Sequence, residues 1–119
     1  MEAKEFLKRY ASGARNFSGI ELSGASLFNT KLSFINLSFA DLSGADLRGG
    51  DLFGADLQST NFRDANLAGV NLSRANLRGA KLYGADLRGA NLRNARFVGI
   101  FYDPSTQFPD GFCPPAPPA

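Results

Sequence analysis

A large apolar residue recurs at every fifth position through most of this chain, and this period constrains the fold more than any other feature. From position 17 onward, seventeen consecutive pentads place Leu or Phe there without an insertion. A period of five matches neither the 3.6-residue repeat of a helix nor the two-residue alternation of a strand. We therefore predict that these side chains form the structural core of a repeat protein. They are Phe17, Leu22, Leu27, Leu32, Leu37, Leu42, Leu47, Leu52, Leu57, Phe62, Leu67, Leu72, Leu77, Leu82, Leu87, Leu92 and Phe97.

The other positions of the pentad are also restricted. The residue two places before the Leu is mostly Ala, as at Ala55, and an Asp or Asn usually separates the two. Gly is frequent two places after the Leu, as at Gly54 and Gly69. A chain that turns a corner in every pentad buries the large and the small side chain and exposes the other three. Gly tolerates the positive φ of such corners, and Asp or Asn side chains bond to nearby backbone groups.

The run of ADLSG, ADLRG, ADLQS, ANLAG and ANLRG resembles the pentapeptide-repeat family, in the form found in bacteria. The resemblance implies an all-β fold, a right-handed quadrilateral parallel β-helix in which four pentads make one coil. Residues 20 apart then stack on one another, and residues 15–99 make a solenoid of about four coils. Repeats of this kind specify a fold more closely than a function.

The polar residues support this register. Aspartates in one coil face Asn or a cation in the next, which avoids repulsion between like charges. Glu21 over Asp41 is the one pair of carboxylates that stack directly.

Both ends of the predicted solenoid carry segments that do not follow the pentad. Residues 1–14 read as an N-terminal capping helix, because Ala3, Phe6, Leu7 and Tyr10 have helical spacing. A helix that docks on a partner or a membrane surface is the alternative. Residues 100–113 are rich in aromatic residues and turn signals, which indicates a C-terminal aromatic cap. Residues 114–119 form a Pro-rich tail, disordered or in polyproline II conformation, for which a role as an SH3 ligand is the less favoured interpretation.

The sequence carries no recognisable catalytic chemistry. It has no His, and its one cysteine, Cys113, lacks a basic partner. In the predicted coil Asp41, Asp46, Asp51 and Asp56 lie on four different faces, so they cannot act on one bond. We expect no catalytic, cofactor-binding or metal site and no cofactor, and we predict that the protein is not an enzyme and has no small-molecule substrate.

Composition limits the partners and the location. The 119 residues are the usual size of one domain, and the net charge of +2 is too small to indicate nucleic-acid binding by itself. No apolar run is long enough to span a membrane, and the charged N-terminus does not resemble a secretory signal. We expect a cytoplasmic protein that binds neither membrane nor nucleic acid. Because both ends look capped, a monomer is favoured.

Two surface features are candidates for binding another protein. The predicted register turns five aromatic residues outward, and these form a candidate interaction surface: Phe28, Phe34, Phe39, Phe53 and Tyr83. It places Phe34 and Phe53 on neighbouring coils near one face, and Phe28 above Arg48. Large apolar residues in contact with water indicate an interface, unless the N-terminal segment folds over the first two coils and covers them.

Charge is the second feature, since an acidic ring on one coil precedes coils rich in arginine. This asymmetry indicates either ordinary solubilising charge or electrostatic steering of a partner.

Three functions fit these patterns. We favour a non-enzymatic scaffold or protein-interaction module whose partner is another protein of unknown identity. The family resemblance implies an alternative, a DNA-mimicking protein that binds DNA gyrase, although this chain is short, net basic and has a single acidic ring. A surface that binds ice, carbohydrate or lipid is the third; it is disfavoured because the chain has only Thr30, Thr60 and Thr106 for a threonine array.

Overall fold

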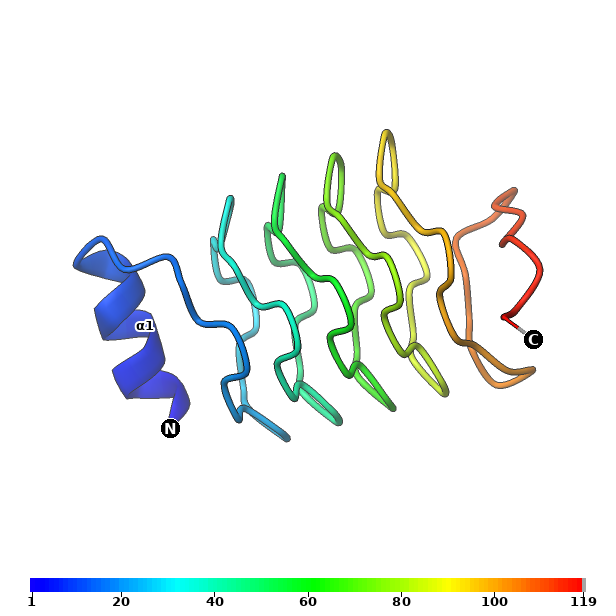
Figure 1. Ribbon diagram of the computed structural model, residues 1–119. Helices are drawn as coiled ribbons and strands as arrows, with labels where there is room; N and C mark the ends of the chain where they lie inside the picture. Colours follow the sequence, from blue (N-terminus) through cyan, green and yellow to red (C-terminus); the bar gives the residue numbers. More distant parts are fainter. Residues whose placement is uncertain (119) are drawn as a thin grey trace.

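The computed structural model describes residues 1–118, and in it the chain winds into a stack of coils closed by a helix at one end (Figure 1). The helix α1 runs from Ala3 to Ala11, within the range that the apolar spacing predicts. Together the helix, the coils and the C-terminal segment measure 38 × 23 × 19 Å. Residue 119, the last of the predicted Pro-rich tail, lies outside the described residues.

Neighbouring coils pair through parallel bridges between residues 20 apart. The bridge from Asn16 to Asn36 is the first of the series, and the bridge from Asn76 to Arg96 still keeps that spacing. Within residues 1–118 these contacts are isolated bridges and no longer strand is present. The predicted all-β class is therefore met in part: the chain has one helix and parallel pairing between coils, but no extended strands.

The corners follow from hydrogen bonds inside each pentad. The carbonyl of the core Leu accepts a bond from the N–H three residues later, as from Ala55 to Leu52 at 3.1 Å. The Asp or Asn before the Leu accepts from the N–H two residues later, as Asp51 does from Phe53 at 2.9 Å. Every fifth residue from 19 to 99 has φ between 55° and 75°. The left-handed backbone at each corner explains the frequent Gly two places after the Leu.

Backbone bonds between coils hold the stack. Leu52 donates to the carbonyl of Asn71 at 2.8 Å, and Asn71 donates to the carbonyl of Gly50 at 3.0 Å. This exchange recurs on each face, so the interior backbone groups are paired, as burial requires.

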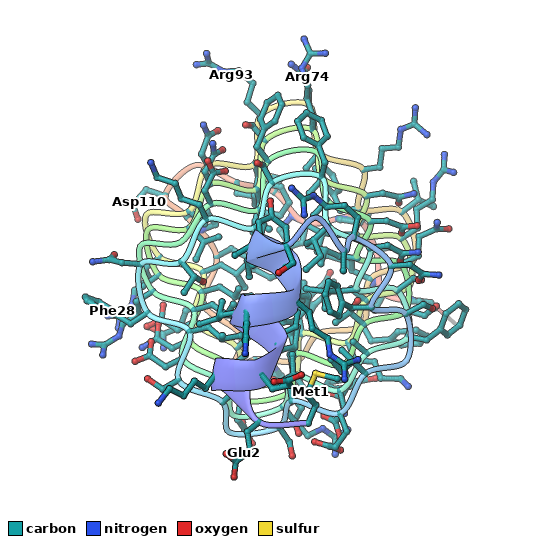
Figure 2. The ribbon with its side chains drawn as sticks, turned by 90° about the vertical axis from the view of Figure 1, so that its left-hand side faces the viewer. Met1, Glu2, Phe28, Arg74, Arg93 and Asp110 are labelled. Carbon is teal, nitrogen blue, oxygen red and sulfur yellow. The ribbon has the colours of Figure 1, made fainter. Side chains whose placement is uncertain are left out.

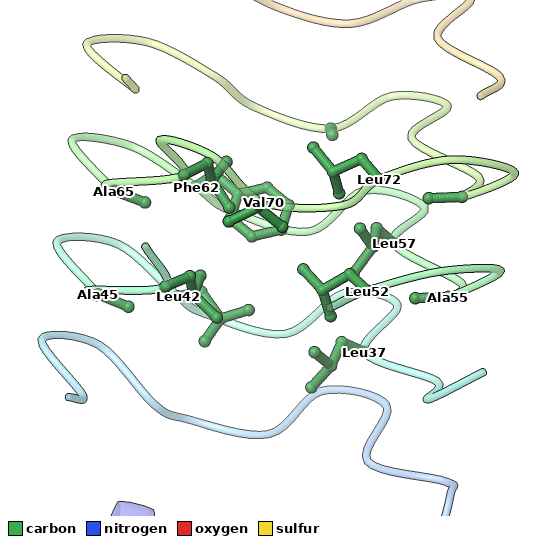
Figure 3. Close-up of a cluster of buried hydrophobic side chains, with 14 of the residues drawn as sticks. Leu37, Leu42, Ala45, Leu52, Ala55, Leu57, Phe62, Ala65, Val70 and Leu72 are labelled. Carbon is green, nitrogen blue, oxygen red and sulfur yellow. The ribbon is translucent and has the colours of Figure 1, made fainter. Parts of the chain in front are cut away.

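The core lies on the axis of the coils, where the Leu columns face one another and small Ala residues flank them (Figure 3). All seventeen predicted core residues are buried except Leu92 and Phe97, which are half-buried in the last coil. The small position also holds larger residues that are fully buried, among them Ile35 and Val70. Thr60 is buried there as well, and its hydroxyl donates to the carbonyl of Leu37 at 2.7 Å.

Helix α1 closes the N-terminal end of the stack. The ring of Phe6 is fully buried and meets the ring of Phe17 edge-on, with 4.8 Å between centroids. The hydroxyl of Tyr10 donates to the carbonyl of Ser33 at 2.8 Å, which ties the helix to a corner of the first coil. The apolar face of α1 therefore contacts the end of the stack and not its sides.

The C-terminal segment continues the coil beyond the last Leu or Phe of the repeat. Lys81 pairs with Phe101, and Asp86 pairs with Gln107, which is 21 residues away instead of 20. Backbone pairing thus extends past residue 99, where the pentad pattern stops, and one extra residue is accommodated between the two bridges.

Aromatic contacts close the C-terminal end of the stack. The ring of Phe112 covers Phe97 edge-on, with 4.9 Å between centroids. The hydroxyl of Tyr102 donates to the carbonyl of Pro115 at 2.6 Å, so the beginning of the Pro-rich tail packs on the aromatic segment.

We expect the substitution Ala55→Leu to destabilise the stack by about 1–3 kcal/mol, because the small position has no space for three more carbons. Ala55 is buried between coils, whereas Ala68 occupies a partly exposed corner position. Ala68→Leu is the matched control and is expected to change stability by less than about 0.5 kcal/mol. Urea unfolding midpoints measure both, and equal midpoints for the two variants would contradict the assignment of Ala55 to the interior.

Candidate interaction surface

The five outward aromatic residues differ in how far water reaches them. Phe28, Phe34 and Phe39 are exposed, whereas Phe53 and Tyr83 are half-buried. The N-terminal segment does not cover the three exposed rings, so the alternative that explained them by such a cover is wrong. The physical reason is that the apolar face of α1 packs against Phe17 at the end of the stack.

Phe34 and Phe53 form a pair at one corner of the first two coils, as the sequence predicts. Their rings meet edge-on, with 5.4 Å between centroids and an angle of 89° between planes. The ring of Phe34 also lies over Gly54, where an added Cβ would come within 2.7 Å of a ring carbon. Gly54 therefore leaves free the space that the ring of Phe34 occupies.

Phe28 and Tyr83 lie elsewhere. The guanidinium carbon of Arg48 lies 5.3 Å from the ring centroid of Phe28, a contact that the sequence predicts. Tyr83 lies 5.0 Å from the guanidinium of Arg63 and contacts the ring of Phe101. Viewed from the helical end, Phe28 and Arg74 point away from different sides of the coil (Figure 2). The five rings thus do not form one continuous surface, and the Phe34–Phe53 pair is the part that the fold brings together.

Two of these rings sit on unfavourable backbone. Phe34 has φ 60° and Phe39 has φ 61°, in the left-handed region that Gly occupies at ten of the seventeen equivalent corners. An L-residue in this region costs about 1–2 kcal/mol. The sequence pattern predicted the outward rings but not the strain of their backbone. A signal was present, because both Phe residues stand at corner positions that Gly mostly occupies.

The charges divide into paired and unpaired groups. Arg48 bonds to Asp46 and Arg88 bonds to Asp86, each at 2.8 Å. In both pairs the guanidinium donates to the carboxylate and lowers the pKa of the aspartate below its usual value. The hydroxyl of Ser43 lowers the pKa of Asp41 in the same direction. Of the four aspartates on the second coil, Asp46 is therefore neutralised by its neighbour Arg48.

Four exposed arginines near one side of the later coils have no such partner. Within residues 1–118 none of them forms an ion pair; they are Arg74, Arg78, Arg93 and Arg96. Arg74 and Arg93 extend from the same edge of the stack (Figure 2). A shallow hollow of about 530 Å³ lies next to them, lined by Gly54, Ala55, Asp56, Arg74, Asn76, Asn94 and Arg96.

Other kinds of site were also sought in the part of the chain that the structure describes. No group of three or more His, Cys, Asp or Glu side chains there lies close enough to hold a metal ion. None of the described helices has the length and apolar character needed to cross a membrane.

Comparison with known proteins identifies the repeat. The family described as "Pentapeptide repeats" matches residues 20–58 and 60–99, in eight copies. The chain belongs to the pentapeptide-repeat family. Members of this family are generally non-catalytic repeat scaffolds. Among the curated proteins, none matches the chain significantly.

Solved structures of other pentapeptide-repeat proteins resemble this chain. Rfr23 from the cyanobacterium Cyanothece 51142 is 39% identical with a TM-score of 0.77, over 78% of this chain and 63% of that one. A protein of the Arabidopsis thaliana thylakoid lumen is 33% identical with a TM-score of 0.70, over 72% and 60%. A protein from Nostoc PCC 7120 is 39% identical with a TM-score of 0.51, over 94% and 88%. This chain thus spans less than two thirds of the first two.

The ion pair of Asp86 makes stability depend on pH in a defined direction. The pKa of Asp86 is lower in the folded chain, so its contribution is complete above the unfolded pKa of about 4 and is lost as the pH falls through the folded pKa. We expect Asp86→Asn to lower the melting temperature at pH 7, with a difference from wild type that shrinks below about pH 4. Thermal melts across this range measure the difference, and Asp110→Asn, on the exposed C-terminal turn, is the control. A difference that persists unchanged in acid would contradict the role of the pair.

Proposed function

We propose that this pentapeptide-repeat protein is a non-enzymatic scaffold that binds another protein, with the Phe34–Phe53 pair at the centre of the contact. We also infer that its coils form the right-handed quadrilateral β-helix of its family, which the parallel bridges at 20-residue intervals support. A rigid shaft of this kind presents side chains at fixed spacings along its surface, which suits recognition better than catalysis.

The conformation and exposure of Phe34 carry the proposal. The residue is 64% exposed and its backbone is in the left-handed region. Exposure of an apolar ring and the strain of its backbone both reduce stability, and Gly at the same position would avoid both. Strained residues that the fold does not require are typical of functional sites. Burial of the Phe34 and Phe53 rings in a partner would recover the hydrophobic free energy that exposure forfeits.

A capture experiment from the lysate of the native host tests the proposal. Wild-type protein is compared with the double variant Phe34→Ser/Phe53→Ser, after circular dichroism has shown that both are folded. Phe28→Ser is the matched control, because Phe28 is a similarly exposed ring on another side of the coil. We expect a protein captured by wild type and by Phe28→Ser but not by the double variant. Equal recovery by all three would contradict the proposal.

The alternative, a DNA mimic that binds DNA gyrase, has one supporting feature, the ring of Asp41, Asp46, Asp51 and Asp56 on successive faces of one coil. Against it, Asp46 is paired with Arg48, and unpaired arginines follow the ring. We therefore expect no inhibition in a DNA-gyrase supercoiling assay. Inhibition at micromolar protein, lost when the four aspartates are changed to asparagine, would favour the DNA mimic instead.

Other expectations from the sequence remain predictions. They are the absence of catalysis, the monomeric state, the segment boundaries and the cytoplasmic location; one solved relative comes from a thylakoid lumen. Light scattering during size-exclusion chromatography tests the monomer.

A further inference from the structure

One side of the shaft combines an apolar corner with unpaired arginines. The corner position that Phe34 occupies in the first coil is taken by Gly54, Arg74 and Asn94 in the following coils. Next to this line runs the column that pairs Asn36, Asp56, Asn76 and Arg96 by successive bridges. From the α1 end toward the C-terminal end, the surface thus changes from aromatic, where the ring of Phe34 lies over Gly54, to basic at Arg74 and Arg96. We call the surface from Phe34 to Arg96 the graded face.

The basic part of the graded face differs electrostatically from the other arginine sites. Arg48 and Arg88 are neutralised by aspartates on their own pentads. Within residues 1–118, by contrast, Arg74, Arg78 and Arg96 form no ion pair, and Asn76 precedes Arg78 by two residues, where Arg48 and Arg88 have their aspartates. The three exposed guanidinium groups therefore present uncompensated positive charge over two adjacent coils, which attracts carboxylates.

We propose that the graded face binds an extended acidic segment of a partner protein, which places one apolar residue on Phe34 and its acidic residues against Arg74 and Arg96. The inference rests on the proposed function and names the chemistry of its partner. Coils stack about 4.8 Å apart, so the three steps from Phe34 to Asn94 span about 14 Å. An extended peptide covers this length with about five residues.

The hollow between the aromatic and the basic part of the graded face determines which end of the bound segment is acidic. It is lined at one end by Gly54, whose corner the ring of Phe34 covers, and it continues past Asp56 to Arg74 and Arg96 with room for the backbone of a peptide. Asp56 lines the hollow, and its Oδ1 accepts from the backbone and side-chain nitrogens of Gln58 at 3.1 and 3.2 Å. A carboxylate would be repelled there, so the acidic residues of the partner belong beyond Asp56, on the two coils farthest from α1.

A protein segment fits this surface better than a nucleic acid. Single strands bind where aromatic rings stack bases between the cations that hold phosphates. Here the rings of Phe34 and Phe53 lie at one end of the graded face, and the residues that line the hollow beside the arginines are not aromatic. Asp56 in the middle of the path opposes a continuous phosphate backbone but is compatible with a peptide whose charges are confined to one end.

A display library of random twelve-residue peptides, selected against the full-length protein, tests the inference without assuming a partner. We expect enriched sequences to contain one large apolar residue and two or more Asp or Glu residues on one side of it. Fluorescence anisotropy then measures the most enriched peptide against Arg74→Glu/Arg96→Glu. The control Arg48→Glu/Arg88→Glu makes the same change in charge at the paired sites. Melting temperatures confirm that both variants are folded.

We expect the Arg74→Glu/Arg96→Glu variant to bind at least about tenfold more weakly, because like charges then face each other, and the control to bind within about threefold of wild type. Binding should also weaken as salt rises. Enriched peptides without an acidic excess, or equal binding by both double variants, would overturn the inference. If peptides without an acidic excess bind Phe34→Ser more weakly than wild type, the proposed function still holds. Tighter binding of an oligothymidine than of every selected peptide would overturn the inference in favour of nucleic acid, and a library that yields no binder would overturn both proposals.

Discussion

Leu57→Lys is expected to unfold most of the shaft at room temperature. Leu57 is fully buried on the axis of the coils, where the lysine ammonium would find neither water nor a carboxylate. The variant loses about 1.5–3 kcal/mol of hydrophobic free energy and adds the cost of burying a charged group. A total loss above about 4–5 kcal/mol is comparable to the whole stability of a small domain. Circular dichroism and urea unfolding measure the loss.

Leu92→Lys provides a control with the same chemistry. Leu92 belongs to the same repeat but is half-buried in the last coil, so a lysine there can extend its ammonium to water. We expect this variant to remain folded and to lose less than half as much stability as Leu57→Lys. If the two variants unfolded at the same urea concentration, the central burial of the Leu columns would not govern stability.

The second large effect is expected at the N-terminal end. Phe6→Ala removes a fully buried ring from the contact between α1 and Phe17, and substitutions of this kind cost about 3–5 kcal/mol. Because each coil contacts only its neighbours, the loss should be concentrated in the helix and the first coil. Hydrogen exchange followed by mass spectrometry should show faster exchange in residues 3–36 and a smaller change in residues 60–90.

Phe39→Ala is the matched control for this experiment, since Phe39 is 68% exposed. We expect its unfolding free energy to stay within about 0.5 kcal/mol of wild type. Unchanged exchange in the first coil of Phe6→Ala would mean that α1 does not protect the end of the stack.

The five-residue period predicted the neighbours of individual side chains as well as the family. Because residues 20 apart stack, the sequence placed Phe34 beside Phe53 and Phe28 above Arg48, and both contacts are present. Periodicity succeeds here because every corner uses the same internal hydrogen bonds, so no tertiary rearrangement changes the register.

Features outside the period were harder to predict. The coil continues to Gln107 without a core Leu, because pairing between coils uses backbone groups that every residue has. The course of the N-terminal segment depended on whether its apolar face met the end or the sides of the stack, and composition does not distinguish these surfaces. The hollow beside Arg74 arises where Gly54 in one column lies next to Asp56 in another, a relation between columns that no single pentad contains.

The parallel bridges at 20-residue intervals also make the shaft a molecular ruler. A whole coil can be inserted or deleted without altering the contacts of α1 or of the C-terminal segment, because each coil presents the same backbone pairing to its neighbours. One added coil between Phe34 and Arg74 would move the aromatic corner and the first arginine apart by about 4.8 Å and change nothing else. In such a chain the number of coils, and not the sequence of a binding loop, sets the distance between two recognition elements.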